Sequence, residues 1–346
     1  MTSIFRIEYI RATIIAGLIL ASVEVFVRTD FFYELAPDSQ AQEPIEIFDL
    51  GFTLITNPEI IVLGNSLTRN SISSFETTRL AAADNHFLLN LSQSAAEMSD
   101  QLWLYQRYRD KIRRADTLII GIDFRSFDKA TSDETGTSSR FRRYASIIQR
   151  LAVKDRSEKI SLLAGSIWKT WDGRQQIRGY ISDILRLRFD WTSKPRMDEL
   201  GRFAVGQPIT TTDVDDIVAQ ATTNYTFAKG VQFEAFTQLV GLAEEDSLKI
   251  ILLETPATDV YLDQLYLNIG DEIHRLYDAI ELETGIGIIQ IALPEDDCPR
   301  VEDCFFDYGH MNANGSKIYT RLLLERLGIP SLPENRSANR SNGGND

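Results

Sequence analysis

A short apolar run that ends in glycine, asparagine and serine constrains this chain more than any other stretch. Residues Ile60–Ser71 read I-I-V-L-G-N-S-L-T-R-N-S. Four consecutive apolar residues, the first three of them β-branched, are typical of a buried strand in a parallel sheet. We therefore expect Ser66 to lie in the turn at the carboxyl end of this strand, the edge at which open α/β sheets bind ligands. Strand-Gly-x-Ser turns are common, so Ser66 alone also fits a residue that only caps the next helix.

A second polar block lies near the other end of the chain. Residues Phe305–Tyr319 read F-F-D-Y-G-H-M-N-A-N-G-S-K-I-Y. Asp307 and His310 share a glycine-containing turn, at a spacing that lets a carboxylate orient an imidazole ring. The chain has three histidines, and only His310 stands in a D-x-x-H-x-N-x-x-G context. Ser66, His310 and Asp307 are therefore a candidate nucleophile, base and orienting acid, which only folding can bring together.

These two blocks resemble those of the SGNH (GDSL-type) hydrolase superfamily. In that family a G-D-S-L block follows the first strand, and a D-x-x-H block precedes the last helix. Here G-N-S-L-T-R and D-Y-G-H-M-N-A-N-G-S stand in those places, and the resemblance extends over roughly Ile60–Leu327. It implies an acyl-serine mechanism without metal or cofactor, in which Ser66 is the nucleophile, His310 the base and Asp307 its partner.

Some positions depart from the family pattern. The family uses the backbone N–H of a glycine as one oxyanion donor. In this chain Ser94 or Ala95, within Asn90–Ala96 (N-L-S-Q-S-A-A), stands near that position, and either residue still has a backbone N–H. Where the family offers an asparagine, G-I-D-F places Asp123, whose ionised carboxylate cannot donate a hydrogen bond. Asn65 replaces the usual aspartate beside the serine and is suited to anchoring the turn. Arg125 follows in D-F-R-S and is a candidate partner for Asp123, so the second oxyanion donor stays open.

The rest of the chain supplies the other strands and helices of an α/β fold. Apolar runs predict strands at His86–Asn90, Thr117–Ile122, Lys249–Glu254 and Gly287–Ala292. Helical patterns are predicted at Ser73–Asp84, Met98–Arg114 and Ser316–Leu327. Strands separated by helices predict a doubly wound, three-layer α/β/α sheet of the flavodoxin-like kind, over residues 58–330.

Three further segments interrupt or flank this pattern. Phe127–Asp246 is longer than one crossover requires, and we expect a mostly helical insertion beside or over the site. Thr29–Asn57 contains a polar, proline-bounded run and is predicted to be a connector. Ser331–Asp346 has almost no apolar residues and is predicted to be a disordered tail.

The insertion carries a basic cluster in an otherwise acidic chain. Its members are Arg140, Arg142, Arg143 and Arg150. Three roles are possible for this basic cluster: a solvated helix face, a contact for anionic headgroups or an acidic glycan, and interdomain packing.

The N-terminal residues Met1–Arg28 are predicted to lie outside the globular domain. Arg6 and Arg11 precede Ala12–Val27, sixteen residues interrupted only by Glu24, which span about 24 Å as a helix. This length is short for a membrane span, but the pattern favours an uncleaved signal anchor or transmembrane helix. A cleaved signal peptide and a peripheral or buried helix remain alternatives. The arginines predict a cytoplasmic N-terminus and an exported, membrane-anchored domain at the cell surface or in the periplasm.

Cys298 and Cys304 are the only two cysteines, and they come shortly before the Asp307–His310 block. In an exported protein, such a pair favours a disulfide that stiffens the loop presenting the base. The alternative is a zinc site that includes His310. It lacks an obvious fourth ligand and would occupy the candidate base.

Charge and context narrow the function. A formal net charge of −14 repels a phosphate backbone, so the sequence argues against nucleic-acid binding. An anchored domain of this kind resembles extracytoplasmic proteins that work with a membrane-bound O-acyltransferase and modify cell-envelope polysaccharides. Acyl (acetyl) transfer to or from a glycan is the first expectation, and a membrane-attached esterase or lipase is the second. A catalytically weak polysaccharide-binding or assembly factor is the third.

Overall fold

A computed structural model gives the fold. It describes residues 2–28, 43–74, 88–94, 96–129 and 225–329, together with isolated residues between 160 and 204.

The core of the molecule is a five-stranded parallel sheet with the strand order β2-β1-β3-β6-β7. Its strands are β1 (Ile60–Leu63), β2 (Leu88–Asn90), β3 (Thr117–Ile122), β6 (Lys249–Glu254) and β7 (Ile288–Ile289). The predicted α/β class and parallel sheet are confirmed. β3 and β6 have the predicted bounds, whereas β7 is much shorter than Gly287–Ala292, because this edge strand is only partly buried.

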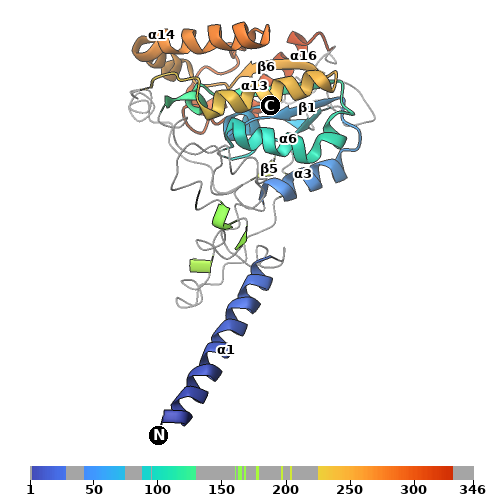
Figure 1. Ribbon diagram of the computed structural model, residues 1–346. Coiled ribbons are helices and arrows are strands. Elements are labelled where there is room, and N and C mark those ends of the chain that lie inside the picture. The colour runs from blue at the N-terminus through green and yellow to red at the C-terminus, as the bar shows by residue number, and fades with distance from the viewer. Residues whose placement is uncertain are drawn as a thin grey trace, which may run out of the picture.

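Helices cover both faces of the sheet, as Figure 1 shows. One face packs against α3 (Glu43–Leu54), α6 (Met98–Ile112), α13 (Val231–Glu245) and the second half of α14 (Asp259–Thr284). The other face packs against α16 (Ala313–Arg326). Strand alternation explains the two layers, because Ile61 and Leu63 of β1 join the first core while Ile60 and Val62 join the second.

Short elements complete the described part of the chain. They are α4 (Ser66–Ser71), the 3-10 turn η1 (Phe124–Phe127) and α15 (Val301–Cys304), all close to strand ends or to the His310 turn. Between residues 160 and 204, β4 (Arg196–Met197) and β5 (Phe203–Ala204) form an antiparallel pair.

Two predicted boundaries need correction. The connector expected at Thr29–Asn57 includes α3, whose Ile47 and Phe48 are fully buried in the core. Each such burial contributes about 1.5–3 kcal/mol, so this segment belongs to the domain. The insertion expected at Phe127–Asp246 includes α13, which packs against α6 and β6 as the crossover helix between β3 and β6.

Several expectations lie outside the described residues. These are most of the helix predicted at Ser73–Asp84, the start of the strand predicted at His86–Asn90, most of the insertion, the basic cluster and the C-terminal tail.

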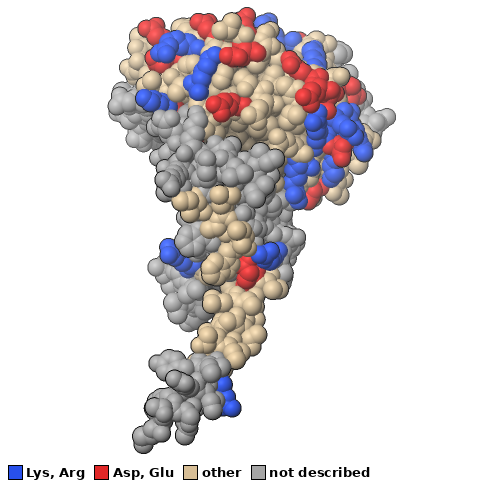
Figure 2. Space-filling model, viewed as in Figure 1, with Lys and Arg blue, Asp and Glu red and all other residues tan. Residues whose placement is uncertain are grey.

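The N-terminal segment forms a single helix, α1 (Thr2–Val27), which extends away from the domain (Figure 1). Most of its described surface in Figure 2 is uncharged. Its exposed apolar side chains are Ile14, Ile15, Leu18, Ile19, Leu20, Val23, Val25 and Phe26. The expectation of a membrane-spanning helix is not supported, since no helix within the described residues has the length and apolar content that a span needs.

Candidate active site

Ser66 lies where the sequence predicts it, in the turn that follows β1. It is the first residue of α4, and Asn65 caps this helix. The Asn65 side-chain oxygen accepts hydrogen bonds from the backbone N–H groups of Leu67 at 3.0 Å and Thr68 at 3.4 Å. These bonds satisfy two of the donors that a helix start leaves without carbonyl partners. The turn that presents the serine is therefore held by its own sequence neighbour.

Two glycines at the ends of β1 and β3 allow α4 to sit close to the sheet. A Cβ atom at either Gly64 or Gly121 would overlap the side chain of Thr68, which is buried against both strands. Because no larger residue fits there without moving α4, these glycines help to determine where the Ser66 hydroxyl lies.

His310 is presented by a tight turn that Asp307 organises. One oxygen of the Asp307 carboxylate accepts hydrogen bonds from the backbone N–H groups of Gly309 at 2.9 Å and His310 at 2.8 Å. Its other oxygen is 2.8 Å from His310 Nδ1. Burial opposes the ionised form of Asp307, but these three hydrogen bonds outweigh it, and the net effect is a lowered pKa. The carboxylate is thus ionised in the neutral range.

The structure brings Ser66, His310 and Asp307 into one chain of contacts. His310 Nε2 lies 2.9 Å from Ser66 Oγ, while Nδ1 of the same ring faces Asp307. Asp307 is buried, whereas Ser66 and His310 are each partly exposed. A buried carboxylate, an imidazole between two partners and an accessible hydroxyl form the arrangement that activates a serine for attack on a carbonyl carbon.

Asp123 lies at the end of β3 and is surrounded by hydrogen-bond donors. Its carboxylate accepts from Asn65 Nδ2 at 2.6 Å, from Arg125 Nη2 at 2.7 Å and from the Arg125 backbone N–H at 3.1 Å. Burial opposes its ionisation, but the Arg125 charge and these hydrogen bonds prevail and lower the pKa of Asp123. The pair with Arg125 considered from the sequence is thus present, and Asp123 also holds the Asn65 side chain that caps α4.

Arg125 extends this network to the turn that carries His310. Its Nη1 donates to the hydroxyl of Tyr308, and the guanidinium lies 5.0 Å from the centre of the Tyr308 ring. Tyr308 in turn packs on Tyr261, with ring centres 4.7 Å apart. Tyr308 was not predicted to belong to the site, although it stands inside the D-Y-G-H block. Its position between Asp307 and His310 was the one available signal.

The remaining candidate residues, Ser94 and Ala95, follow β2 in the sequence. Ser94 accepts a hydrogen bond from Arg69 Nη1 at 2.5 Å, and Arg69 belongs to α4. Ala95 lies outside the described residues. Ser66 is the first residue of α4, so its own backbone N–H is a candidate oxyanion donor.

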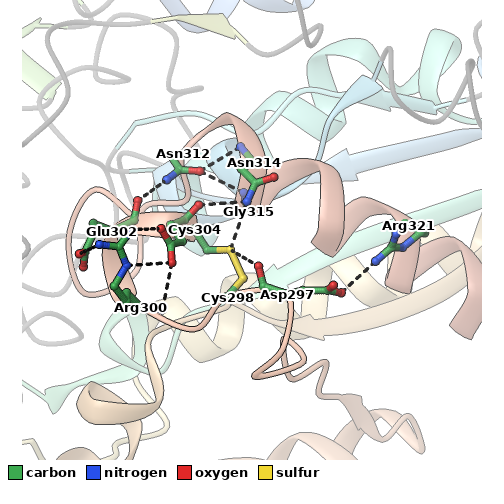
Figure 3. Close-up of a disulfide and its surroundings, with 10 residues drawn as sticks. Asp297, Cys298, Arg300, Glu302, Cys304, Asn312, Asn314, Gly315 and Arg321 are labelled. Carbon is green, nitrogen blue, oxygen red and sulfur yellow. Dashed lines mark hydrogen bonds and ion pairs between the residues drawn. A yellow bond between two sulfur atoms is a disulfide. The ribbon is translucent and has the colours of Figure 1, made fainter. Parts of the chain in front are cut away.

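A disulfide braces the segment that leads into the His310 turn, as Figure 3 shows. Cys298 and Cys304 are bonded, with Cα atoms 5.8 Å apart. Next to the bond, Asn312 Nδ2 donates to the Glu302 carbonyl at 3.0 Å. Gly315 of α16 lies so close to the Cys304 carbonyl that a Cβ atom there would overlap it. Because the two sulfurs are bonded to each other, they are not available as the thiolate ligands of the alternative zinc site.

Within the described residues, no group of three or more His, Cys, Asp or Glu side chains is arranged to hold a metal ion.

Comparisons with known proteins add little to this geometry. No protein-family model matches the chain, and no curated protein matches it. Among solved structures, the chain is similar to a GDSL-like lipase from Bacteroides thetaiotaomicron, with a TM-score of 0.36 and 10% sequence identity. That similarity covers 82% of this chain and 95% of the lipase chain.

Proposed function

We propose that this protein is a serine-dependent acyl-transfer enzyme of the SGNH type, acting on an ester through an acyl-serine intermediate. The observation that carries the proposal is the chain of contacts from Ser66 Oγ to His310 Nε2, at 2.9 Å, and from His310 Nδ1 to Asp307, at 2.8 Å. The order of the blocks, the turn after the first strand and the D-x-x-H turn before the last helix give independent support.

In the proposed reaction, Ser66 Oγ attacks the ester carbonyl carbon while His310 Nε2 accepts the hydroxyl proton. His310 then protonates the leaving alcohol, and the acyl group stays on the serine. Water or a second alcohol attacks the acyl-serine and gives its proton to His310. His310 returns this proton to Ser66 Oγ as the acyl–serine bond breaks, and the acyl group leaves on the acceptor. Asp307 holds the ring and stabilises its positive charge in both halves.

For the acyl acceptor or donor, we favour a hydroxyl of a cell-envelope polysaccharide over a general lipid ester. Two features support an exported protein. The first is the Cys298–Cys304 disulfide, a bond that persists in oxidising compartments. The second is the row of exposed apolar side chains on α1, which fits attachment to a membrane or to a membrane-bound O-acyltransferase.

A second candidate function has one observation in its favour. Asp123 stands where the family offers an asparagine donor, and its carboxylate is already occupied by Arg125 and Asn65. If one oxyanion donor is missing, the domain is a weak catalyst and acts as a polysaccharide-binding or assembly factor.

Ester hydrolysis by matched variants tests the proposal. The full chain is assayed with p-nitrophenyl acetate beside Ser66→Ala, His310→Ala and Gln106→Ala. Gln106 is an exposed residue of α6 and serves as the control. We expect turnover by the parent and by Gln106→Ala, and loss of turnover in the other two variants. Turnover that survives in folded Ser66→Ala contradicts the proposal.

The same assay separates transfer from hydrolysis. With neutral oligosaccharides present, free acetate falls below released p-nitrophenol if a sugar hydroxyl accepts the acyl group. Equal amounts of the two products identify a plain esterase.

A further inference from the structure

A large cavity lies beside the candidate triad and is not part of it. It has a volume of about 780 Å³ and lies between the carboxyl ends of β6 and β7, one side of α14 and the loop before α15. Neither Ser66 nor His310 lines it. Ligand pockets commonly have volumes of about 300–1,000 Å³ and occur at this edge of an open α/β sheet.

The cavity shares a wall with the turn that carries His310. Residues Thr255–Thr258 line the cavity. The Thr258 backbone N–H, within the same segment, donates to the Tyr308 carbonyl at 2.8 Å. A narrow second cavity shares Glu254 and Tyr277 with the large one and is bounded by Arg125 and Tyr308. A molecule bound in the large cavity is therefore separated by one layer of residues from the contact between Arg125 and Tyr308 beside the triad.

Four polar side chains from three elements converge in this cavity. Glu254 ends β6 and accepts a hydrogen bond from the Tyr277 hydroxyl of α14 at 2.5 Å. Gln290, just after β7, donates through Nε2 to the Tyr266 hydroxyl at 3.2 Å. Burial raises the pKa of Glu254, although hydrogen bonds from Tyr277, Gln290 and Tyr266 oppose that effect. An amide, two phenols and a carboxylate together offer both donors and acceptors, which is what the hydroxyl groups of a sugar require.

The charge of the lining argues against an anionic ligand. The carboxylate residues of the lining are Glu254, Asp259, Glu281 and Glu295. The lining also includes Arg300, which forms ion pairs with Asp303 at 2.8 Å and with Glu302 at 3.3 Å. A uronate or phosphate would meet net negative charge here. A compact cation is also poorly served, because the carboxylate of the polar cluster, Glu254, already accepts a hydrogen bond from the Tyr277 hydroxyl at 2.5 Å.

We propose that this cavity binds uncharged sugar units of a glycan, next to the triad and separate from it. The role of the bound glycan, as the acceptor or as the ester-bearing substrate, rests on the proposed function. Binding of the glycan does not depend on the proposed function, so the binding proposal and the acyl-transfer proposal can fail separately. The tyrosines supply apolar ring surface for the sugar, and the amide and carboxylate fix its orientation.

Calorimetric titration of the full chain tests this proposal. The chain carries Ser66→Ala so that no turnover accompanies binding. The probes are maltotriose and chitotriose as neutral glycans, trigalacturonate as an anionic glycan, and tetramethylammonium as a cation. We expect a neutral trisaccharide to bind, and trigalacturonate and tetramethylammonium to bind at least about tenfold more weakly.

Variants assign the binding to the cavity. Gln290→Ala removes one polar group, and Ala292→Trp places a large ring at an exposed position of the lining. Each substitution is expected to raise the dissociation constant of the neutral trisaccharide by about tenfold. Gln106→Ala, on α6, is the matched control and is expected to bind like the parent. Thermal unfolding of each variant separates lost binding from lost folding.

Three outcomes overturn the proposal. In the first, neither neutral trisaccharide binds. In the second, both cavity variants bind the trisaccharide as tightly as the control variant does. In the third, tetramethylammonium or trigalacturonate binds more tightly than the neutral trisaccharides. The ester assay on the parent chain gives the independent result. Turnover without glycan binding refutes this proposal alone, whereas glycan binding without turnover refutes the proposed acyl-transfer chemistry alone.

Discussion

Replacing Asp123 by asparagine tests the role of the charged network beside the triad. Family resemblance alone predicts a gain, because asparagine is the usual residue there and its amide can donate to an oxyanion. The contacts predict a loss. Both carboxylate oxygens receive donors: Oδ2 from Asn65 Nδ2 at 2.6 Å and Arg125 Nη2 at 2.7 Å, and Oδ1 from the Arg125 backbone N–H at 3.1 Å. In either rotamer, the new amide N–H₂ would face donors.

The size of the loss follows from burial. Breaking a fully buried ion pair costs about 3–5 kcal/mol. The side chain of Asp123 is 7% exposed and that of Arg125 is 36% exposed, so water partly compensates the guanidinium once its partner is neutral. We therefore expect Asp123→Asn to lower the free energy of unfolding by about 2–4 kcal/mol near pH 7. Ester turnover falls as well, because Asp123 holds the Asn65 cap of the turn that presents Ser66.

The effect has a definite pH dependence. The folded pKa of Asp123 is lowered, so its ionisation stabilises the fold fully above the unfolded pKa of about 4. That contribution is lost as the pH falls through the folded pKa. The difference in stability between the parent and Asp123→Asn is therefore largest at neutral pH and shrinks in acid.

Urea unfolding at pH 7 and below measures this difference from the shift in midpoint at unchanged slope. Asp110→Asn is the control. It makes the same chemical change in the exposed pair with Arg113, where Nη2 and Oδ1 are 2.9 Å apart, and should cost at most about 0.5 kcal/mol. An Asp123→Asn variant as stable as the parent, with faster ester turnover, would refute the reasoning.

Three further predictions concern the triad and its supports. Asp307→Asn should lower kcat for ester hydrolysis by about 10³–10⁴-fold while the fold is kept, because it disturbs the orientation of the imidazole; a loss below about tenfold would contradict the assigned role. Replacing Cys298 and Cys304 together by serine should cost about 2 kcal/mol in thermal unfolding, given the sequence separation of 6, and an unchanged midpoint would count against a stabilising disulfide. Gly121→Ala should cost about 1–3 kcal/mol and reduce turnover, since its methyl group overlaps Thr68. Adding Thr68→Ala to Gly121→Ala should restore part of the lost stability and part of the lost turnover. If neither recovers, overlap with Thr68 is not the cause of the loss.

The sheet was predictable because its strands are continuous apolar runs. In a parallel sheet both faces are covered, so a buried strand such as Thr117–Ile122 needs no alternation and is easily recognised. The edge strand β7 pairs with one neighbour only, and its predicted length was wrong for that reason. Ser66, Asp307 and His310 were accessible to sequence reasoning because each stands in a short local motif next to a strand or a helix.

Some features of the fold and of the site were not predicted from the sequence, and several of these depend on contacts between distant segments. The helix α3 follows a polar, proline-containing run that reads as a linker, although Ile47, Phe48 and Ile55 carry an apolar pattern that could have identified it. The contact from Arg125 to Tyr308 joins residues 183 positions apart. No local spacing encodes such a contact, and the same holds for the cavity between β6, β7 and α14.

Labelling with a fluorophosphonate tests the central claim most directly, because this probe reacts with a serine that has a working base. The full chain is labelled beside Ser66→Ala, His310→Ala and the control Gln106→Ala, and the modified peptide is identified by mass spectrometry. We expect a single phosphonylated residue, Ser66, in the parent and in Gln106→Ala, and no labelling in the other two. A folded parent that stays unlabelled, or labelling that persists in Ser66→Ala, would contradict it.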